Sequence, residues 1–329
     1  MKAILNRLFE HKHLSMAEAK EVLINIASEK YNECEIAAFL SVYIMRSITV
    51  EELSGFRDAL LEMCVGVDLS DFDIIDMCGT GGDGKNTINI STLSSFVVAG
   101  AGYKVAKHGN YGVSSGCGSS NILESLGYQF TNHSDALRAD LERAGICFLH
   151  APLFNPAMKH VAPIRKKLSV KTFFNMLGPM VNPARPNRQL IGVFSLELAR
   201  LYNYIYQNSG KSFMIVHSMD GYDEISLTGQ FKLVNNGVER ILDPGVFGLG
   251  KYSPEQIAGG TSLTDSLNLF MTILEGKGTQ AQTSVVLANS ALAIKCFHQE
   301  KTCLECVEIA KESLMSGKAM QALKKLLNK

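Results

Sequence analysis

The sequence has no excess of charge of either sign. Lys and Arg together number 32, as do Asp and Glu, so the formal net charge at pH 7 is zero. A neutral chain lacks the overall basic field that would hold nucleic acid or an anionic membrane surface. It also lacks any apolar run approaching the ~18 residues that a membrane-spanning helix requires. We therefore expect no nucleic acid and no membrane as partners, and any phosphate-binding site must be local.

Other signals are absent as well. The first residues form an amphipathic, acid-containing stretch rather than a signal peptide, and no repeat or low-complexity linker interrupts the chain. Without a secretion signal, the eight cysteines indicate free thiols in a reducing compartment. With 46% hydrophobic and 19% charged residues over 329 positions, the chain can fill a packed core. We expect a globular, cytoplasmic protein of one large domain or two ordinary ones.

The first seventy residues carry helix-start signals. Ser15 with Glu18, and Thr49 with Glu52, fit the capping box, in which a hydroxyl and a carboxylate satisfy two free backbone amides. The stretch 32–45 is apolar almost all round, which is typical of a helix buried against other helices or against a second copy. These patterns predict a helical domain over residues 1–70, completed by a proline-bearing segment at about 165–187. They also predict a homodimer formed through the N-terminal helices.

Beyond residue 70, short apolar strands alternate with helical stretches. The predicted strands are 73–77, 103–106, 146–149, 190–194 and 213–217. Strands joined by helices form right-handed βαβ units, which make a largely parallel sheet. The predicted fold class is therefore α/β, with a parallel-sheet domain over residues 71–329 and a smaller all-helical domain.

Glycine is concentrated in one part of the chain, since residues 79–118 hold ten of the 28 glycines. Glycines after a strand let several backbone N–H groups converge on an anion. The segment 79–84 fits the dinucleotide fingerprint, but the second strand ends in Lys107-His108 where that fold has an acidic residue. The segment 79–85 fits a P-loop, but Asn86 occupies the position of the Mg²⁺-binding Ser or Thr. Neither pattern is satisfied.

Polar side chains extend this glycine-rich loop. Asn89–Thr92 supplies hydroxyls and amides at a helix start, and Lys107–Asn110 adds a cation and an amide at the carboxyl end of the next strand. Further hydroxyls follow at 113–115 and 118–119. Ligands of open α/β sheets bind at the carboxyl ends of the strands. Three anion-binding elements around one crevice suit a ligand with several phosphates.

Together these segments resemble the anthranilate phosphoribosyltransferase family. The matching segments run in order along nearly the whole chain: 78–83, 89–92, 107–110, 155–165, 174–179, 182–185 and 223–226. The resemblance implies a nucleoside phosphorylase/phosphoribosyltransferase-like fold with the site between a helical and an α/β domain. It also implies a reaction of tryptophan biosynthesis. The phosphoribosyl group of phosphoribosyl pyrophosphate moves to the amine of anthranilate, and pyrophosphate is released.

The resemblance also implies roles for individual residues. The positions expected to surround phosphoribosyl pyrophosphate are Gly79, Gly82, Asp83, Thr87, Asn89, Ile90, Ser91, Thr92, Lys107, His108, Gly109, Asn110, Ser114, Ser115 and Ser119. The positions expected at anthranilate are Gly79, Asn110 and Arg165, with the Arg165 guanidinium facing the carboxylate. Two Mg²⁺ ions are expected, and the positions for metal are Ser91, Asp223 and Glu224. No residue is assigned as acid or base, and we expect His108 to have a structural or ligand-orienting role.

The chain departs from the family's usual residues in the loop that follows Lys107–Asn110. The differing positions there are Tyr111, Gly116, Cys117 and Asn121, and two further departures, His150 and Asn155, lie near the expected acceptor pocket. Tyr111 and Gly116 replace two cations, and Asn121 replaces an acid. Lys85 and Lys104 are candidates to supply the missing positive charge.

Two other functions stay open. A pyrimidine nucleoside phosphorylase of the same fold would carry Lys-His-Ser in its phosphate loop, which this chain lacks at Met77 and the residues that follow. A non-enzymatic, nucleic-acid-binding relative should be basic and should lack the acids at 223 and 224. Cys303 and Cys306 fit half of a zinc site, but no second ligand pair lies nearby, so we interpret them as packing residues.

Overall fold

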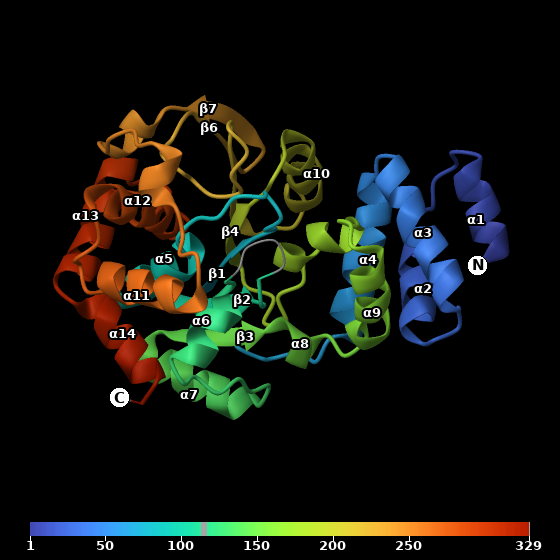
Figure 1. The fold of residues 1–329 in the computed structure, drawn as a ribbon, viewed down its shortest axis with the longest axis horizontal. Coiled ribbons are helices and arrows are strands. Elements are labelled where there is room, and N and C mark those ends of the chain that lie inside the picture. Colours follow the sequence, from blue (N-terminus) through green and yellow to red (C-terminus); the bar gives the residue numbers. More distant parts are fainter. Residues whose placement is uncertain (113–116, 329) are drawn as a thin grey trace. The chain divides into compact units, whose positions relative to one another are not determined.

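The computed structural model describes residues 1–112 and 117–328, so the predictions for Ser114 and Ser115 lie outside the described residues. The chain divides into two compact units (Figure 1). One unit consists of Met1–Gly66 and Ala151–Pro183, and the other of Val67–His150 and Ala184–Lys329. Among the described residues, no helix is long and apolar enough to cross a membrane.

The first unit is built from helices alone. Its elements are α1 (Lys2–Phe9), α2 (Met16–Ala27), α3 (Glu33–Met45), α4 (Val50–Met63), α8 (Ala151–Phe154), α9 (Met158–Leu168), η1 (Phe173–Met176) and η2 (Gly178–Met180). The capping boxes predicted at Ser15 and Thr49 are confirmed, and Asn32 forms a third at the start of α3. Each box satisfies backbone amides that a helix start leaves free, so these residues fix where the helices begin.

An aromatic cluster explains why a later segment joins the N-terminal helices. Phe39 and Tyr43 of α3 and Phe56 of α4 surround Phe173 of η1, and the Phe56 and Phe173 rings stack at 4.3 Å. All four rings are buried. Because aromatic rings bury large apolar areas, Phe173 fills a core that residues 1–66 leave incomplete.

The second unit combines a seven-stranded sheet with helices. Its strands are β1 (Ile74–Gly79), β2 (Lys104–Gly109), β3 (Ile146–His150), β4 (Arg188–Gly192), β5 (Ser212–Ser218), β6 (Phe231–Asn235) and β7 (Val238–Leu242). Its helices are α5 (Ile90–Gly100), α6 (Ser119–Ser125), α7 (Ser134–Ala144), α10 (Leu196–Tyr206), η3 (Pro244–Phe247), η4 (Pro254–Ile257), α11 (Leu263–Leu274), α12 (Gln280–Lys295), α13 (Cys303–Met315) and α14 (Lys318–Leu326).

The strands lie in the order β3-β2-β1-β4-β5-β6-β7. The first five are parallel and match the five strands predicted from the sequence, whereas β6 and β7, which were not predicted, pair antiparallel at one edge. The predicted α/β fold class with a largely parallel sheet is therefore confirmed. The strand order reverses at β1, which lies between β2 and β4, and such a reversal opens a crevice at the carboxyl ends.

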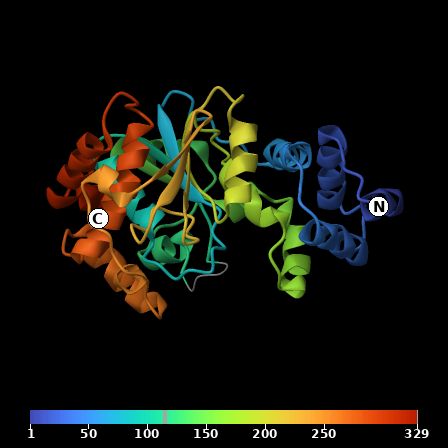
Figure 2. The same cartoon turned by 90° about the horizontal axis from the view of Figure 1, so that it is seen from above.

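Side chains alternate between the two faces of the sheet. Met77 of β1 and Val105 of β2 point into the main core, which α5, α12, α13 and α14 complete. Phe213 of β5 points to the opposite face, where its ring meets Tyr206 of α10. Figure 2 shows helices on both sides of the strands. The parallel strands are thus buried on both faces, as all-parallel sheets require.

The contact between α2 and α4 predicts the effect of a small substitution. A Cβ at Gly55 of α4 would lie 2.3 Å from the Met16 carbonyl oxygen and 2.8 Å from the Ala19 Cβ. We expect Gly55→Ala to lower the free energy of unfolding by about 1–3 kcal/mol, because the helices must separate to admit the methyl group. Urea unfolding followed by circular dichroism measures this change.

Gly66→Ala is the matched control, because a Cβ there meets nothing within 4 Å. It should leave stability unchanged or slightly raised, since alanine restricts the unfolded chain. Equal stability of the two variants would contradict the close helix contact.

Candidate functional site

The loop after β1 lies against the residues that follow β5. Gly79, the last residue of β1, pairs with Gly192, the last residue of β4. A Cβ at Gly79 would lie 2.4 Å from Asp223 Oδ2, and a Cβ at Gly192 would overlap the Asp223 carbonyl oxygen. Only glycine fits at both strand ends. The pair thereby admits Asp223 to the carboxyl edge of the sheet.

Two acids hold the loop between β1 and α5 (the first loop, residues 80–89) and the start of α5. The Gly81 N–H donates to Asp223 Oδ2 at 2.7 Å, and the Ser91 N–H donates to Glu224 Oε1 at 2.9 Å. The Asp223 N–H in turn donates to Asp83 Oδ2 at 3.5 Å. The structure therefore brings together four predicted positions that are far apart in the sequence: Asp83, Ser91, Asp223 and Glu224.

Burial and mutual repulsion govern the charge of these acids. Removal from water, followed by repulsion from Asp83, raises the pKa of Asp223 to about 7. Burial, then repulsion from Asp223 and Asp83, raises the pKa of Glu224 to about 8, although Lys107 acts in the opposite direction. Three carboxylates share this small region, so their ionised form needs further positive charge.

The donor atoms of this region suit a hard cation. Asp83, Asp223 and Glu224 offer carboxylate oxygens, and Ser91 offers a hydroxyl. Mg²⁺ prefers oxygen ligands and is held by one or two carboxylates together with phosphate oxygens. The residues present therefore fit Mg²⁺.

Lys107 places a buried positive charge next to Ser91. It is only 2% exposed, and its Nζ donates to the Met77 carbonyl oxygen at 2.7 Å. The same Nζ lies 3.5 Å from Ser91 Oγ. Lys107 therefore links β1, β2 and the first turn of α5.

The loop between β2 and α6, the second loop, is tied to the start of α5 by one side-chain amide and to α6 by two hydrogen bonds. Asn89 Nδ2 donates to the Cys117 carbonyl oxygen at 3.0 Å. The Asn110 carbonyl oxygen accepts from the Ser120 N–H at 3.2 Å and from Ser119 Oγ at 3.3 Å. The remaining predicted positions of this unit lie on the first loop (Gly82, Thr87), in the first turn of α5 (Ile90, Thr92) and at the end of β2 (His108, Gly109). Backbone amides and hydroxyls thus converge from both loops.

Arg165 lies in the helical unit, on α9. Its guanidinium carbon lies 5.2 Å from the centre of the Phe174 ring, and Nη2 donates to Asn175 Oδ1 at 3.3 Å. Burial lowers its pKa, though an arginine stays charged at any physiological pH. The ring and the amide fix the guanidinium in one orientation within its own unit.

Comparisons with known proteins cover the chain almost completely. Residues 71–320 match the model of the glycosyl transferase family a/b domain, and residues 2–64 match the helical bundle domain of the same family. An anthranilate phosphoribosyltransferase from Flavobacterium psychrophilum is 59% identical over 326 residues, covering 99% of this chain and 98% of that protein. One from Bacteroides fragilis is 54% identical over 327 residues, covering 99% of each chain. The chain belongs to the anthranilate phosphoribosyltransferase family.

Solved structures of the family have the same fold. The anthranilate phosphoribosyltransferase of Thermus thermophilus superposes with a TM-score of 0.91 at 31% identity and covers 98% of each chain. The enzyme of Saccharomyces cerevisiae, in complex with phosphoribosyl pyrophosphate and Mg, has a TM-score of 0.91 at 27% identity, covering 98% of this chain and 96% of that one. The membership predicted from the order of the sequence motifs is confirmed.

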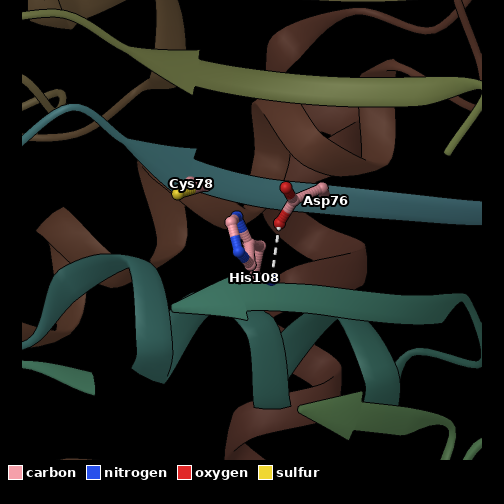
Figure 3. A group of neighbouring side chains, drawn as sticks. All are labelled: Asp76, Cys78 and His108. Atoms are coloured by element: carbon pink, nitrogen blue, oxygen red, sulfur yellow. Dashed lines mark hydrogen bonds between the residues drawn. The ribbon is translucent and has the colours of Figure 1, made fainter. Parts of the chain in front are cut away.

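One buried cluster was not predicted. Asp76 and Cys78 project from β1 toward His108 of β2, and their potential ligand atoms lie within 4.8 Å of one another (Figure 3). Asp76 Oδ1 accepts the backbone N–H of His108 at 3.0 Å. Burial strongly raises the pKa of the Cys78 thiol. A neutral thiol and a carboxylate already used as a backbone acceptor indicate a structural link between the strands. Asp76 lies in an apolar run, and no spacing along the chain signals its contact with the neighbouring strand.

One candidate for the missing positive charge is wrong. Lys104 lies at the amino end of β2, where its Nζ donates to the Leu141 carbonyl oxygen at 2.6 Å. The site lies at the carboxyl end of that strand, so Lys104 is too far along β2 to serve it. Lys85 lies on the first loop, with its Nζ 4.7 Å from the centre of the Tyr222 ring beside Asp223.

The raised pKa values predict how stability depends on pH. In the folded state Asp223 and Glu224 keep their protons to about pH 7 and 8, whereas unfolded carboxyls lose theirs near pH 4. The folded state binds more protons in this interval, so the free energy of unfolding in EDTA should fall as pH rises through it. In Asp223→Asn/Glu224→Gln the fall should be smaller, because amides keep the two backbone acceptors without the charge. Parallel slopes in urea titrations from pH 5 to 8.5 would contradict the assignment.

Proposed function

We propose that the chain transfers the 5-phosphoribosyl group of phosphoribosyl pyrophosphate to the amine of anthranilate in L-tryptophan biosynthesis. The products are N-(5-phosphoribosyl)anthranilate and pyrophosphate. The observation that carries the proposal is the 59% identity to an anthranilate phosphoribosyltransferase over 99% of the chain. The convergence of amides, hydroxyls and carboxylates at the ends of β1 and β2 supports it.

Phosphoribosyl pyrophosphate would bind to the two loops and the start of α5. Backbone N–H groups around Gly79–Asp83 and at the α5 N-terminus favour negative charge, as helix starts do in general. Lys107 adds a buried positive charge beside Ser91. The described residues assigned to this ligand are those named from the resemblance: Gly79, Gly82, Asp83, Thr87, Asn89, Ile90, Ser91, Thr92, Lys107, His108, Gly109, Asn110 and Ser119.

Two Mg²⁺ ions would be held by Ser91, Asp223 and Glu224 together with the phosphates. When bound, Mg²⁺ neutralises charge on the departing pyrophosphate. The acids have a second task, because Asp223 and Glu224 also accept the Gly81 and Ser91 amides. They therefore keep the first loop and α5 in position.

Catalysis would depend on positioning and on electrostatic stabilisation. The bond between the ribosyl carbon and the pyrophosphate oxygen breaks while the anthranilate nitrogen forms its bond to that carbon. The anthranilate amine is already a nucleophile, so no protein nucleophile is needed.

The buried Asp76 carboxylate holds the backbone of His108, which supports an orienting role for this residue. Arg165 would bind the anthranilate carboxylate through paired hydrogen bonds, with Gly79 and Asn110 beside the aromatic ring.

We also propose that the protein is a cytoplasmic homodimer. All eight cysteines are free thiols, as a reducing compartment requires. The N-terminal helices expose Phe9, Ile44 and Met45, the last at 88%. Apolar side chains of this size are candidates for contact with a second copy.

The other two functions are not favoured. The close relatives named above carry the anthranilate activity in their names, and no nucleoside phosphorylase is needed to explain the match. The net charge of zero and the presence of both acids at 223 and 224 argue against a nucleic-acid-binding relative.

The activity and the metal site can be tested together. Anthranilate fluorescence should fall when purified protein, phosphoribosyl pyrophosphate and Mg²⁺ are mixed, with an equal amount of pyrophosphate released. Asp223→Asn/Glu224→Gln should lower kcat/KM by about 100-fold or more, because the charges that hold the metal are removed. The matched control is Asp135→Asn/Glu142→Gln on the exposed surface of α7, which should keep full activity. A wild type that binds phosphoribosyl pyrophosphate without consuming anthranilate would contradict the proposed acceptor.

Arg165 can be separated from the phosphate site by its kinetic effect. Arg165→Met should raise KM for anthranilate by about 10- to 100-fold, the range for losing a charge-assisted bidentate pair, and leave KM for phosphoribosyl pyrophosphate within twofold. Lys166→Met, a change at the exposed neighbour on α9, should alter neither constant. Equal increases in both KM values would argue against a specific contact with anthranilate.

A further inference from the structure

Tyr111 is held at three points although its side chain is 39% exposed. Its ring meets the His150 imidazole edge-on, with ring centres 5.0 Å apart. Its hydroxyl donates to Glu124 Oε1 at 3.1 Å, and its backbone N–H donates to Asn110 Oδ1 at 2.8 Å. An exposed tyrosine with partners at the ring, the hydroxyl and the backbone is fixed in one orientation.

His150 connects this tyrosine to the body of the α/β unit. It is the last residue of β3 and is 5% exposed. Its ring stacks on Phe130 at 4.3 Å, with 15° between the planes, and Nδ1 lies 2.8 Å from Ser120 Oγ. Burial lowers the pKa of His150, which favours the neutral form of the ring. One imidazole thus contacts Tyr111, α6 and the loop that carries Phe130.

Asn121 brings two parts of the second loop together. Its Oδ1 accepts both the Gly112 N–H, at 3.0 Å, and the Gly118 N–H, at 2.9 Å. The approach is close, since a Cβ at Gly118 would lie 2.3 Å from the Gly112 nitrogen. One amide oxygen therefore holds Gly112 beside Gly118.

The described parts of this loop, Gly109–Gly112 and Cys117–Asn121, carry no charged side chain. From Gly109 to Asn121 the sequence contains no Asp, Glu, Lys or Arg. An anion at this segment would be met by backbone N–H groups and hydroxyls. Such donors stabilise an anion well only when they are held in position before it binds. The contacts of Tyr111, His150 and Asn121 supply that order.

We propose that Tyr111, His150 and Asn121 form a neutral brace, whose role is to position the backbone of Asn110–Gly112 and Gly118–Ser120 for phosphoribosyl pyrophosphate. All three are positioning residues, and the proposal rests on the function proposed above. Tyr111 and His150 act as a pair, because removal of either ring abolishes the same contact. Asn121 acts separately, through the two backbone amides.

A double-mutant cycle tests the pairing. Tyr111→Ala and His150→Ala should each raise Kd and KM for phosphoribosyl pyrophosphate by about tenfold and leave kcat within threefold, since the reacting groups are untouched. The double variant should also show about a tenfold rise, because residues in direct contact are not additive. Calorimetry with Mg²⁺ measures Kd without the acceptor, and thermal unfolding checks that each variant is folded.

Three further variants make the test specific. Tyr111→Phe keeps the ring and should stay within about threefold of the wild type, since it loses one exposed hydrogen bond. Asn121→Ala should raise Kd by about tenfold, and it tests the brace if His150→Ala does not fold. Tyr204→Ala removes an exposed tyrosine of α10 and should change nothing.

The possible results separate the brace from the function on which it rests. A rise of about 100-fold in the double variant would mean that the two rings act independently, which overturns the pairing. Unchanged Kd values in the Tyr111→Ala and Asn121→Ala variants, beside a wild type that binds, would overturn the brace and leave the proposed function intact. A folded wild type that does not bind phosphoribosyl pyrophosphate would refute both.

Discussion

The site depends on one close approach, that of Asp223 to the ends of β1 and β4. The paired glycines Gly79 and Gly192 leave no side chain there, so the Asp223 backbone and carboxylate can both reach the sheet edge. The carboxylate then fixes the first loop through the Gly81 amide, and the adjacent Glu224 fixes the start of α5. A larger residue at either strand end would displace the acids, the loop and the helix start together.

This arrangement sets stability against function. Three carboxylates are packed where water is scarce, which raises the pKa of two of them and costs free energy when they ionise. Hydrogen bonds from backbone amides offset part of that cost. The positive charge of Lys107 offsets another part, because it lowers the pKa of Glu224. Repulsion between buried acids is typical of functional sites, because the same carboxylates bind a cation. A divalent cation bound by these oxygens would offset the repulsion between the carboxylates.

The sequence predicts the parallel strands and the glycine loops because their signals are local. The β6–β7 hairpin was missed although Asn236-Gly237, both with positive φ, is a typical turn between two such strands. The link from Asp76 to His108 joins two strands, so no spacing along the chain reveals it. Lys104 was misjudged although the predicted strand 103–106 already placed it at the amino end, opposite to the site. Pairing between strands decided the Asp76 contact, whereas the hairpin and the place of Lys104 had local signals.

The helical unit is assembled from two stretches of chain, and strands β1, β2 and β3 of the other unit are encoded between them. During synthesis the first four helices emerge early, but the Phe173 ring that completes their aromatic core and the helix α9 that covers α2 and α3 emerge only much later. The nascent N-terminal helices must therefore expose apolar surface until the ribosome has passed Pro183. Exposed surface of this kind attracts chaperones or aggregates. The order of the segments along the chain thus delays the folding of the helical unit until its second stretch has been synthesised.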